Sequence, residues 1–164
     1  MIELFYLMIP AYIANMAPVF ARRINWNTPL DFGKTFRGRR IFGDNKTWRG
    51  LIVGTIAGTV VGVAASQLYW PVAVSPFLWS LLASFGALCG DATKSFFKRQ
   101  FGISSGQSWT PFDQIDYSIG ALLLGSIVYF PGWINAAIII LASAIGHIAV
   151  NHFAYYTKIR GEKW

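Results

Sequence analysis

Six acidic and basic side chains lie close together in a chain that otherwise carries few charges. They occur between two uncharged runs of about 40 residues each, and they are Asp91, Lys94, Lys98, Arg99, Asp113 and Asp116. Carboxylates bind hard cations such as Mg²⁺, and lysine and arginine side chains bind phosphate groups. The stretch Gly90–Tyr117 therefore predicts a site for a metal ion and phosphates at the border of an apolar body.

The spacing of these residues places them at the ends of two helices. Asp91, Lys94, Ser95 and Lys98 have offsets of three, four and seven, which form one face of a helix. Two aspartates three positions apart begin the next apolar run. Two helix ends can direct carboxylates at one point, and Mg²⁺ needs only one or two carboxylates because waters and substrate phosphates complete its shell. The expected ligands are Asp91, Asp113 and Asp116 for Mg²⁺, and Lys94, Ser95, Lys98 and Arg99 for phosphates.

Each aspartate also has an ordinary structural explanation. Asp113 alone could cap a helix, and Asp91 alone could pair with Lys94 or Lys98. Asp116 is harder to explain in this way, since it lies about one turn into an apolar helix. An ionisable group within a membrane is costly and usually functional, so Asp116 is the strongest of the three candidates.

The basic segment 22–49 is a second source of cations. Its candidate ligands for a polyphosphate are the cations Lys46, Arg49, Arg37, Arg39 and Arg40 and the hydrogen-bonding side chains Asn45 and Thr47. The alternative explanation is the general excess of basic residues at cytoplasmic membrane ends, where they contact anionic headgroups. Substrate binding is favoured for the group around Lys46, and both explanations stay open for Arg22 and Arg23.

The whole chain has the composition of a polytopic membrane protein. Of its 164 residues, 54% are hydrophobic and 13% are charged, whereas soluble domains average roughly 25% charged residues. About 20 apolar residues cross a bilayer as a helix. The apolar runs therefore predict an all-α protein with five transmembrane helices at about 2–21, 51–69, 77–95, 112–130 and 134–156. The second span has a glycine at every fourth position from Gly50 to Gly62, which is typical of close helix packing.

The basic residues predict how these spans are oriented. Five spans place the loops 22–49 and 97–110 and the tail 157–164 on one side. Of the 14 Lys and Arg residues 13 fall there, and the other one, Lys94, is at the adjacent end of the third span. We therefore expect the N-terminus outside, the C-terminus in the cytoplasm and the site on the cytoplasmic face of the cell membrane. Membrane orientation then explains the net charge of +7 without binding to nucleic acid. One cysteine, Cys89, excludes an intramolecular disulfide.

The same residues form a series that resembles a known signature. Gly90-Asp91, then Ser95-Phe-Phe-Lys98-Arg99, then Asp113-Gln-Ile-Asp116 resembles the motif of membrane CTP:phosphatidate cytidylyltransferases. Asn45-Lys46-Thr47-Trp48-Arg49-Gly50 is similar to their upstream Lys-Thr-Trp motif. The small size, the five expected spans and the residues of the first loop are most similar to the archaeal branch, the CDP-archaeol synthases.

The resemblance implies a Mg²⁺-dependent nucleotidyl transfer. CTP would react with an isoprenoid glycerol-phosphate ether lipid, 2,3-bis-O-geranylgeranyl-sn-glycerol 1-phosphate, to give CDP-archaeol and pyrophosphate. The lipid phosphate is already an anionic nucleophile, so the absence of a Ser-His or Cys-His set agrees with this reaction. Two other hypotheses stay open: a small non-enzymatic transporter or channel subunit, suggested by Asp116 and His147 within spans, and another lipid enzyme such as a lipid kinase.

Overall fold

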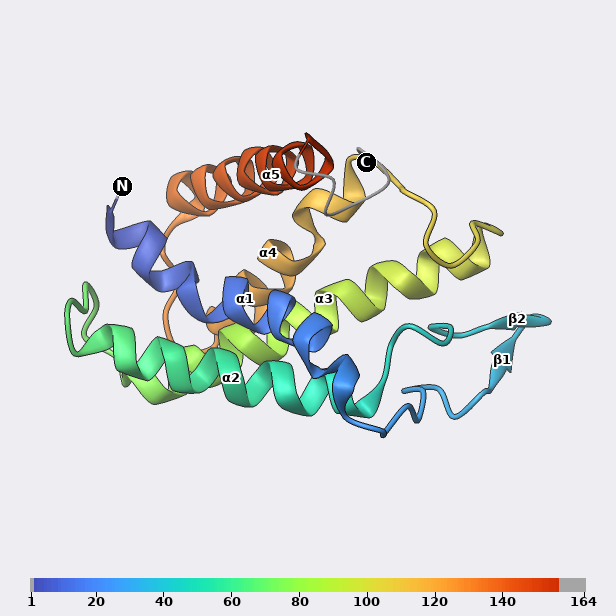
Figure 1. The fold of residues 1–164 in the computed structure, drawn as a ribbon. Helices are drawn as coiled ribbons and strands as arrows, with labels where there is room; N and C mark the ends of the chain where they lie inside the picture. The colour runs from blue at the N-terminus through green and yellow to red at the C-terminus, as the bar shows by residue number, and fades with distance from the viewer. Residues whose placement is uncertain (1, 157–164) are drawn as a thin grey trace.

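The computed structural model describes residues 2–156, which contain five α-helices. In chain order the helices are α1 (Ile2–Phe20), α2 (Trp48–Ser66), α3 (Pro76–Gln100), α4 (Phe112–Gly125) and α5 (Trp133–Tyr156) (Figure 1). A short 3₁₀ turn, η1 (Ala21–Arg23), extends α1. Each apolar segment that was expected to be helical contains a helix, and the expected tail 157–164 lies outside the described residues.

The loop between α1 and α2 contains a small antiparallel hairpin that the all-α prediction lacked. Its strands are β1 (Thr35–Phe36) and β2 (Arg39–Arg40). The two turn residues, Arg37 and Gly38, have φ angles of 52° and 75°. A two-residue hairpin turn needs positive φ angles to match the twist of its strands, and glycine adopts them without steric cost. The fold is therefore mostly helical with one hairpin in the first loop.

Three of the described helices are long and apolar enough to cross a membrane. They are α1 extended by η1, α2, and the part of α5 from Trp133 to Val150. The last ten residues of α3 carry four charges, and α4 has only 14 residues. At about 1.5 Å per residue α4 is about 21 Å long, less than the ~30 Å hydrocarbon core of a bilayer. The helices agree with a multi-pass membrane protein, and three of the five expected spans have the required length and composition.

Two helix ends lie five residues from their expected bounds, and α2 begins and ends three residues earlier than expected. α3 continues to Gln100, so Lys98 and Arg99 belong to a helix and not to the expected loop 97–110. Basic residues suit this last turn because they offset the partial negative charge of its carbonyl groups. α4 ends at Gly125 and not near residue 130. The N–H groups of Val128 and Tyr129 both bond to the Gly125 carbonyl, which turns the chain toward α5.

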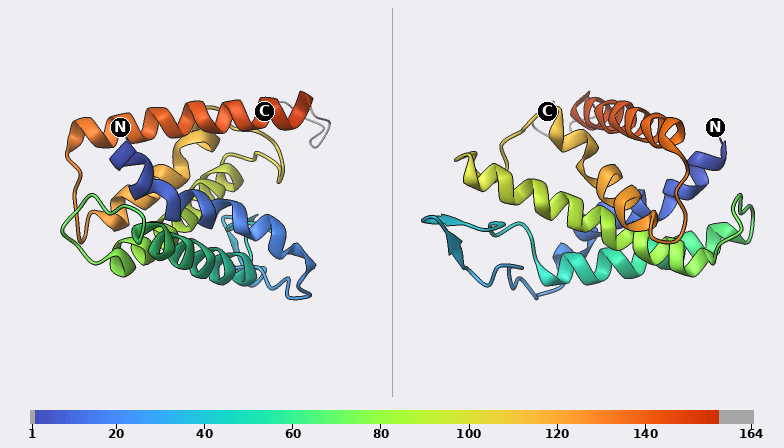
Figure 2. Two further views of the ribbon diagram at one scale, coloured as in Figure 1. Left: turned by 60° about the vertical axis from the view of Figure 1, so that its left-hand side comes forward. Right: turned by 180° about the vertical axis from the view of Figure 1, so that it is seen from behind.

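Glycines on α2 allow α1 and α3 to approach closely, as the four-residue repeat predicted. A Cβ at Gly54 would lie 2.7 Å from the carbonyl oxygen of Ala14 on α1 and 2.8 Å from the side chain of Leu88 on α3. A Cβ at Gly58 would lie 2.5 Å from the carbonyl oxygen of Pro10. α1, α2 and α3 therefore form one closely packed group, and α5 lies along α4 at the edge of the bundle (Figure 2).

A second glycine contact, between α3 and α4, was not predicted. A Cβ at Gly90 would overlap the carbonyl oxygen of Asp116, and a Cβ at Gly120 would overlap the carbonyl oxygen of Gly86. Only glycine permits this separation, because any side chain would force the two backbones apart. This contact brings the end of α3 beside the start of α4.

The two loops that carry most of the polar residues lie at the same end of the bundle. The end of α1, the start of α2, the end of α3 and the start of α4 are on the right in Figure 1, together with the hairpin. The described N-terminus and the connection from α2 to α3 are at the opposite end. The loops 24–47 and 101–111 therefore lie at the same end of the bundle as the site that the sequence predicted.

Candidate active site

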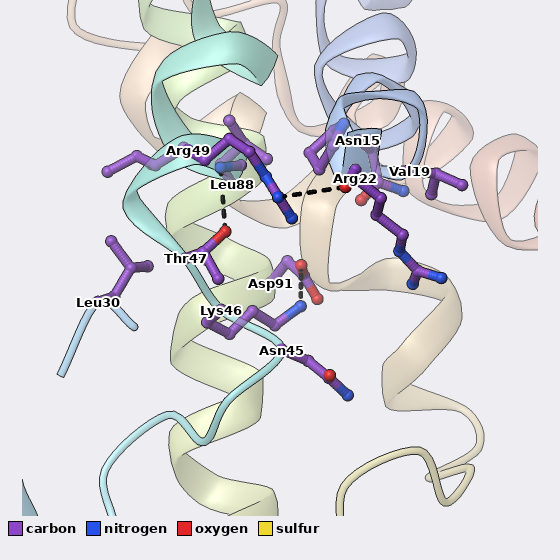
Figure 3. Close-up of a pocket in the computed structure, with 13 residues that line it drawn as sticks. Asn15, Val19, Arg22, Leu30, Asn45, Lys46, Thr47, Arg49, Leu88 and Asp91 are labelled. Atoms are coloured by element: carbon purple, nitrogen blue, oxygen red, sulfur yellow. Dashed lines mark hydrogen bonds and ion pairs between the residues drawn. The ribbon is translucent and has the colours of Figure 1, made fainter. Parts of the chain in front are cut away.

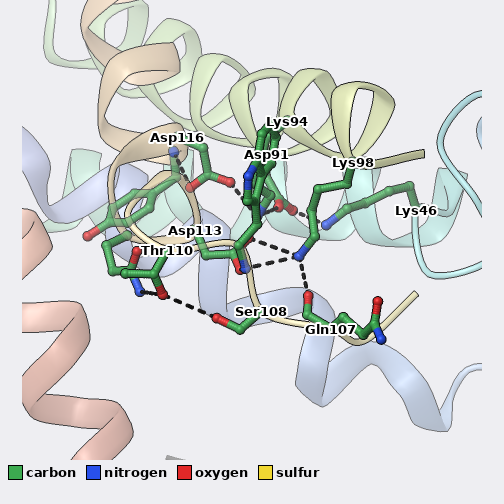
Figure 4. A network of polar contacts seen from close by, with 12 residues as sticks. Lys46, Asp91, Lys94, Lys98, Gln107, Ser108, Thr110, Asp113 and Asp116 are labelled. Carbon is green, nitrogen blue, oxygen red and sulfur yellow. Dashed lines mark hydrogen bonds and ion pairs between the residues drawn. The ribbon is translucent and has the colours of Figure 1, made fainter. Parts of the chain in front are cut away.

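Lys94 lies at the centre of a cluster of three carboxylates. Its Nζ is 3.1 Å from Asp91 Oδ1, 2.9 Å from Asp113 Oδ1 and 2.7 Å from Asp116 Oδ2 (Figure 4). Asp91 and Lys94 come from α3, and the other two aspartates come from the first turns of α4. We call these four residues the Lys94 cluster. The structure thus brings together the three aspartates whose spacing predicted a common point.

Lys98 joins this cluster to the loop between α3 and α4. Its ammonium group is buried and lies 3.2 Å from each carboxylate oxygen of Asp113. The same ammonium donates to the carbonyl of Gln107. Asp113 also accepts a hydrogen bond of 2.6 Å from the backbone N–H of Trp109. Lys98 and Asp113 therefore fix the loop over the end of α3.

Lys46 approaches the cluster from the first loop. It forms an ion pair with Asp91 Oδ2, while Asp91 Oδ1 pairs with Lys94. The next residue, Thr47, is the N-cap of α2, and its Oγ1 accepts a 3.1 Å hydrogen bond from the N–H of Gly50. The threonine that was expected to bind phosphate thus starts the helix that positions Lys46. A threonine just before an apolar helix is a recognisable capping signal.

Arg49, another expected phosphate ligand, is bound to the segment that follows α1. Its side chain is buried, and its Nη1 donates to the carbonyl of Ile24 and, at 2.7 Å, to Asn27 Oδ1. The same Nη1 lies 3.5 Å from the carbonyl oxygen of Arg22. These acceptors hold the guanidinium in place, and its positive charge still faces the pocket described below.

The other expected ligands lie outside the Lys94 cluster. Asn45 Nδ2 donates a 2.7 Å hydrogen bond to Ser105 Oγ and so joins the two loops. Arg39 donates to the carbonyl of Gln100 at the end of α3. Arg99 packs near Gly43 in the first loop, and Ser95 is buried on α3. Arg39, Asn45 and Arg99 therefore hold the hairpin and the two loops together at the end of α3.

The first loop has its own buried carboxylate, Asp31. Burial alone would raise the pKa of Asp31, but hydrogen bonds from the Arg40 guanidinium and from the N–H groups of Phe42, Gly33 and Gly43 outweigh it and lower the pKa to about 2. Backbone N–H groups and one guanidinium therefore surround the ionised carboxylate of Asp31. Asp31 organises the hairpin that carries Arg39 and Arg40.

A pocket of about 290 Å³ opens beside Asp91, between α1, α2, α3 and the first loop (Figure 3). Its polar and charged lining residues are Asn15, Arg22, Asn45, Lys46, Thr47, Arg49 and Asp91. Its apolar lining includes Val19, Leu30 and Leu88. Both explanations, substrate binding and membrane orientation, had stayed open for Arg22, and its place in this lining favours substrate binding. Asn15 was detectable from its polarity within an apolar span, but the sequence did not show that it would lie opposite Lys46. We call this cavity the Lys46 pocket.

The donor atoms of the Lys94 cluster suit Mg²⁺, although the described residues include no group of three carboxylate, imidazole or thiol side chains already arranged around a metal position. The ammonium of Lys94 occupies the point on which the three carboxylates converge. Asp116 Oδ2 is buried, and among the described residues its cation contact is the Lys94 ammonium at 2.7 Å. Three carboxylates, one of which has a buried oxygen of this kind, form a set of oxygen donors that fits a hard cation.

Comparisons with known proteins give one family for the whole chain. The family model described as "CarS-like: CDP-archaeol synthase" matches residues 1–164. A CDP-archaeol synthase of Methanoregula boonei is 38% identical, covering 96% of this chain and 100% of the relative. That of Pyrococcus furiosus is 37% identical, covering 99% of this chain and 98% of the relative.

A solved structure agrees with this result. It belongs to an intramembrane enzyme for archaeal membrane lipids biosynthesis and matches with a TM-score of 0.82 and 36% identity. The match covers 92% of this chain and 93% of that chain. The comparisons do not support the transporter or channel hypothesis.

Proposed function

This chain belongs to the CDP-archaeol synthase family, and we propose that the Lys94 cluster and the Lys46 pocket form its catalytic site. The protein is a cytidylyltransferase of archaeal membrane lipid synthesis, which joins CMP to an ether-lipid phosphate. The observation that carries the proposal is the meeting of three carboxylates and the ammonium groups of Lys46, Lys94 and Lys98 at one end of the bundle.

The proposed substrates are CTP and 2,3-bis-O-geranylgeranyl-sn-glycerol 1-phosphate. An oxygen of the lipid phosphate forms a bond to the α-phosphorus of CTP, while the bond from this phosphorus to the oxygen that bridges to the β-phosphorus breaks. The electron pair of that bond leaves with pyrophosphate, and CDP-archaeol remains. The attacking oxygen is already anionic, so the main obstacle is repulsion between two polyanions. Fixed positive charges reduce this repulsion in a transition state that gains charge on the leaving group.

The cations of the site have distinct proposed roles. Lys98, buried beneath the loop 101–111, holds the triphosphate near the carbonyl of Gln107. Lys94 leaves the carboxylates when a substrate phosphate offers a stronger acceptor, and it then stabilises the reacting phosphates. Lys46 stands between the cluster and the pocket through its pair with Asp91, so it contacts the phosphates of both substrates where they meet.

Asp91, Asp113 and Asp116 are the proposed ligands of Mg²⁺. When bound, the ion neutralises phosphate charge and orients the triphosphate for in-line displacement. Asp113 and Asp116 stand one turn apart at the start of α4, and the glycine contact with α3 sets their position relative to Asp91. The protein's own contribution is thus a fixed set of oxygen donors beside the ammonium groups of Lys46, Lys94 and Lys98.

We also propose that this end of the bundle faces the cytoplasm, with the N-terminus outside and α3 and α4 as further spans. The excess of Lys and Arg in the loops at this end supports the orientation. A cytoplasmic site would have direct access to CTP. To test the orientation, a single cysteine is introduced at exposed Arg23 or at exposed Gln67 in a Cys89→Ser background. A membrane-impermeant thiol reagent should react with the cysteine at position 67 from outside, and with the cysteine at position 23 only after permeabilisation.

The function is tested by an activity matrix of four nucleotides against several lipid phosphates, with and without Mg²⁺. Purified protein should release pyrophosphate and form a CDP-lipid only with CTP, the ether-lipid phosphate and Mg²⁺ together.

Asp116→Asn should lower kcat by about 10²-fold or more, because a charged ligand at the reacting phosphates is lost. The matched control, Asp44→Asn, removes an exposed carboxylate of the first loop and should keep its activity. Normal turnover by Asp116→Asn would refute the proposed metal role.

A further inference from the structure

The hairpin of the first loop is attached to the last two turns of α3. The ring of Phe36 in β1 packs against the ring of Phe96, with 5.9 Å between the ring centroids. Arg39 in β2 donates to the carbonyl of Gln100, and the Gln100 side chain donates a 3.4 Å hydrogen bond back to the Arg40 carbonyl. Figure 1 shows the hairpin at the same end of the bundle as the end of α3. The hairpin is therefore anchored to a helix that carries part of the site.

The position of Arg39 suits the end of a helix. The last carbonyl groups of a helix have no partner within it and carry a partial negative charge, which a guanidinium offsets. The loop 101–111 continues from there through Gly102, whose φ of 79° favours glycine. A Cβ at Gly102 would lie only 3.2 Å from Arg39 Nη1. The charge of Arg39 is thus used within the protein, at the point where α3 passes into the loop 101–111.

A second contact joins the first loop directly to the loop 101–111. Asn45 Nδ2 donates a 2.7 Å hydrogen bond to Ser105 Oγ, and both residues are exposed. Asn45 directly precedes Lys46 (Figure 3). Ser105 lies two residues before Gln107, whose carbonyl accepts a hydrogen bond from Lys98. The contact therefore connects the two segments that hold two ammonium groups of the site.

We infer that Asn45 and Ser105 are positioning residues, and that their hydrogen bond and the anchored hairpin hold the two loops as one unit over the Lys94 cluster. Lys46 and Lys98 then keep a fixed separation, and fixed geometry is what two cations that act on the same reacting phosphates require. Asn45 acts through Lys46 and needs no contact with a substrate. This inference rests on the proposed function, because it explains how the site of that reaction is held in shape.

Two neighbouring serines provide a matched test. Ser105→Ala removes the acceptor of Asn45, whereas Ser104→Ala removes another exposed hydroxyl of the same loop. In Ser105→Ala, kcat/KM for CDP-lipid synthesis should fall about threefold to tenfold, the usual effect of one lost hydrogen bond, and in Ser104→Ala it should stay unchanged. Asn45→Ala should cause the same loss as Ser105→Ala, and the double variant should lose no more than either single one, because all three lack the same bond.

The same variants show whether Asn45 binds a substrate itself. In that case Asn45→Ala would lose clearly more activity than Ser105→Ala, and the two effects would add in the double variant. Either this result or full activity of Ser105→Ala would overturn the inference.

Hydrogen exchange separates failure of this inference from failure of the function. It is measured in detergent without nucleotide or lipid substrate, and it is evaluated in the loop that carries no substitution. Asn45→Ala should speed exchange of the Gln107 amide, and Ser105→Ala that of the Lys46 amide, each by about threefold or more, since both amides bond within their own loops. Ser104→Ala should leave exchange of the Lys46 amide unchanged.

Arg39→Gln tests the anchor of the unit in the same way. It should speed exchange of the Gly102 amide and lower kcat/KM, whereas Lys34→Gln, which removes another exposed cation of the first loop, should change neither. Unchanged exchange across the loops in Asn45→Ala or in Ser105→Ala would overturn the inference, while CDP-lipid synthesis by the wild type still upheld the function. Absence of CDP-lipid synthesis by the wild type would instead refute the function.

Discussion

Lys94 and Asp116 form an ion pair of 2.7 Å across the interface of α3 and α4, and Asp116 Oδ2 has no other cation contact among the described residues. The same ammonium also lies close to Asp91 and Asp113. Lys94 is therefore the one cation that the three carboxylates share among the described residues. This arrangement makes Lys94 the cation that keeps the cluster together before a metal ion and substrates bind.

Replacement of Lys94 by methionine should expose that role. Lys94→Met keeps most of the side-chain volume and leaves three carboxylates without their shared partner, at a cost of about 3–5 kcal/mol if the charges stay buried. We expect a lower Tm than the wild type without Mg²⁺ and a larger increase in Tm on adding it. Thermal unfolding in detergent measures both. Lys34→Met, at an exposed position in the first loop, is the control. Equal Tm values of Lys94→Met and the wild type without Mg²⁺ would contradict this role.

The glycine contact between α3 and α4 predicts opposite effects of the same substitution at two helical positions. In Gly120→Ala the new methyl group overlaps the carbonyl of Gly86, so we expect a loss of about 1–3 kcal/mol in the free energy of unfolding and a marked loss of activity. In Gly146→Ala, on α5, nothing lies within 4 Å of the added Cβ. Alanine should there leave stability unchanged or raise it by up to about 1 kcal/mol. Thermal unfolding and CDP-lipid formation test the pair, and equal tolerance at both positions would rule out the close contact.

The low pKa of Asp31 predicts how the first loop responds to acid. Because its pKa falls from 3.8 to about 2 on folding, the ionised carboxylate contributes about 2 kcal/mol to the structure at neutral pH. This contribution is complete above pH 3.8, about half lost near pH 3 and absent below pH 2. Hydrogen-exchange protection of the Phe42 and Gly43 amides, which bond to Asp31, should follow this course. Asp31→Asn should have low protection throughout, and protection that stays constant from pH 6 to pH 2.5 in the wild type would exclude the linkage.

The helices and the meeting of the aspartates could be predicted because they depend on local patterns. Long apolar runs require hydrogen-bonded helices in lipid, and offsets of three and four residues place side chains on one face. An even number of crossings between two loops places them at the same end. These rules were enough to predict that Asp91 and Lys94 lie near Asp113 and Asp116.

The partners of individual side chains could not be predicted in this way. A basic residue near a motif suggests a phosphate ligand, but Arg49 finds backbone carbonyls in the segment after α1, whose path the sequence does not show. Asn15 is a polar residue within an apolar run, but the sequence does not show that it lines the Lys46 pocket. Both outcomes depend on how α1 ends and how the first loop returns to α2. The sequence shows that α3 and α4 contain glycines, but it does not show that these glycines face one another.

The contact of Gly90 with the carbonyl of Asp116 has a mechanical consequence. The backbones that carry Asp91 and Asp116 touch, so neither helix can move toward the other, and a sliding motion would force the glycines out of register. The separation of the two carboxylates is thus set by main-chain atoms and not by adaptable side chains. Any opening and closing around a substrate is then left to the two loops at this end of the bundle, 24–47 and 101–111, while α3 and α4 stay fixed against each other.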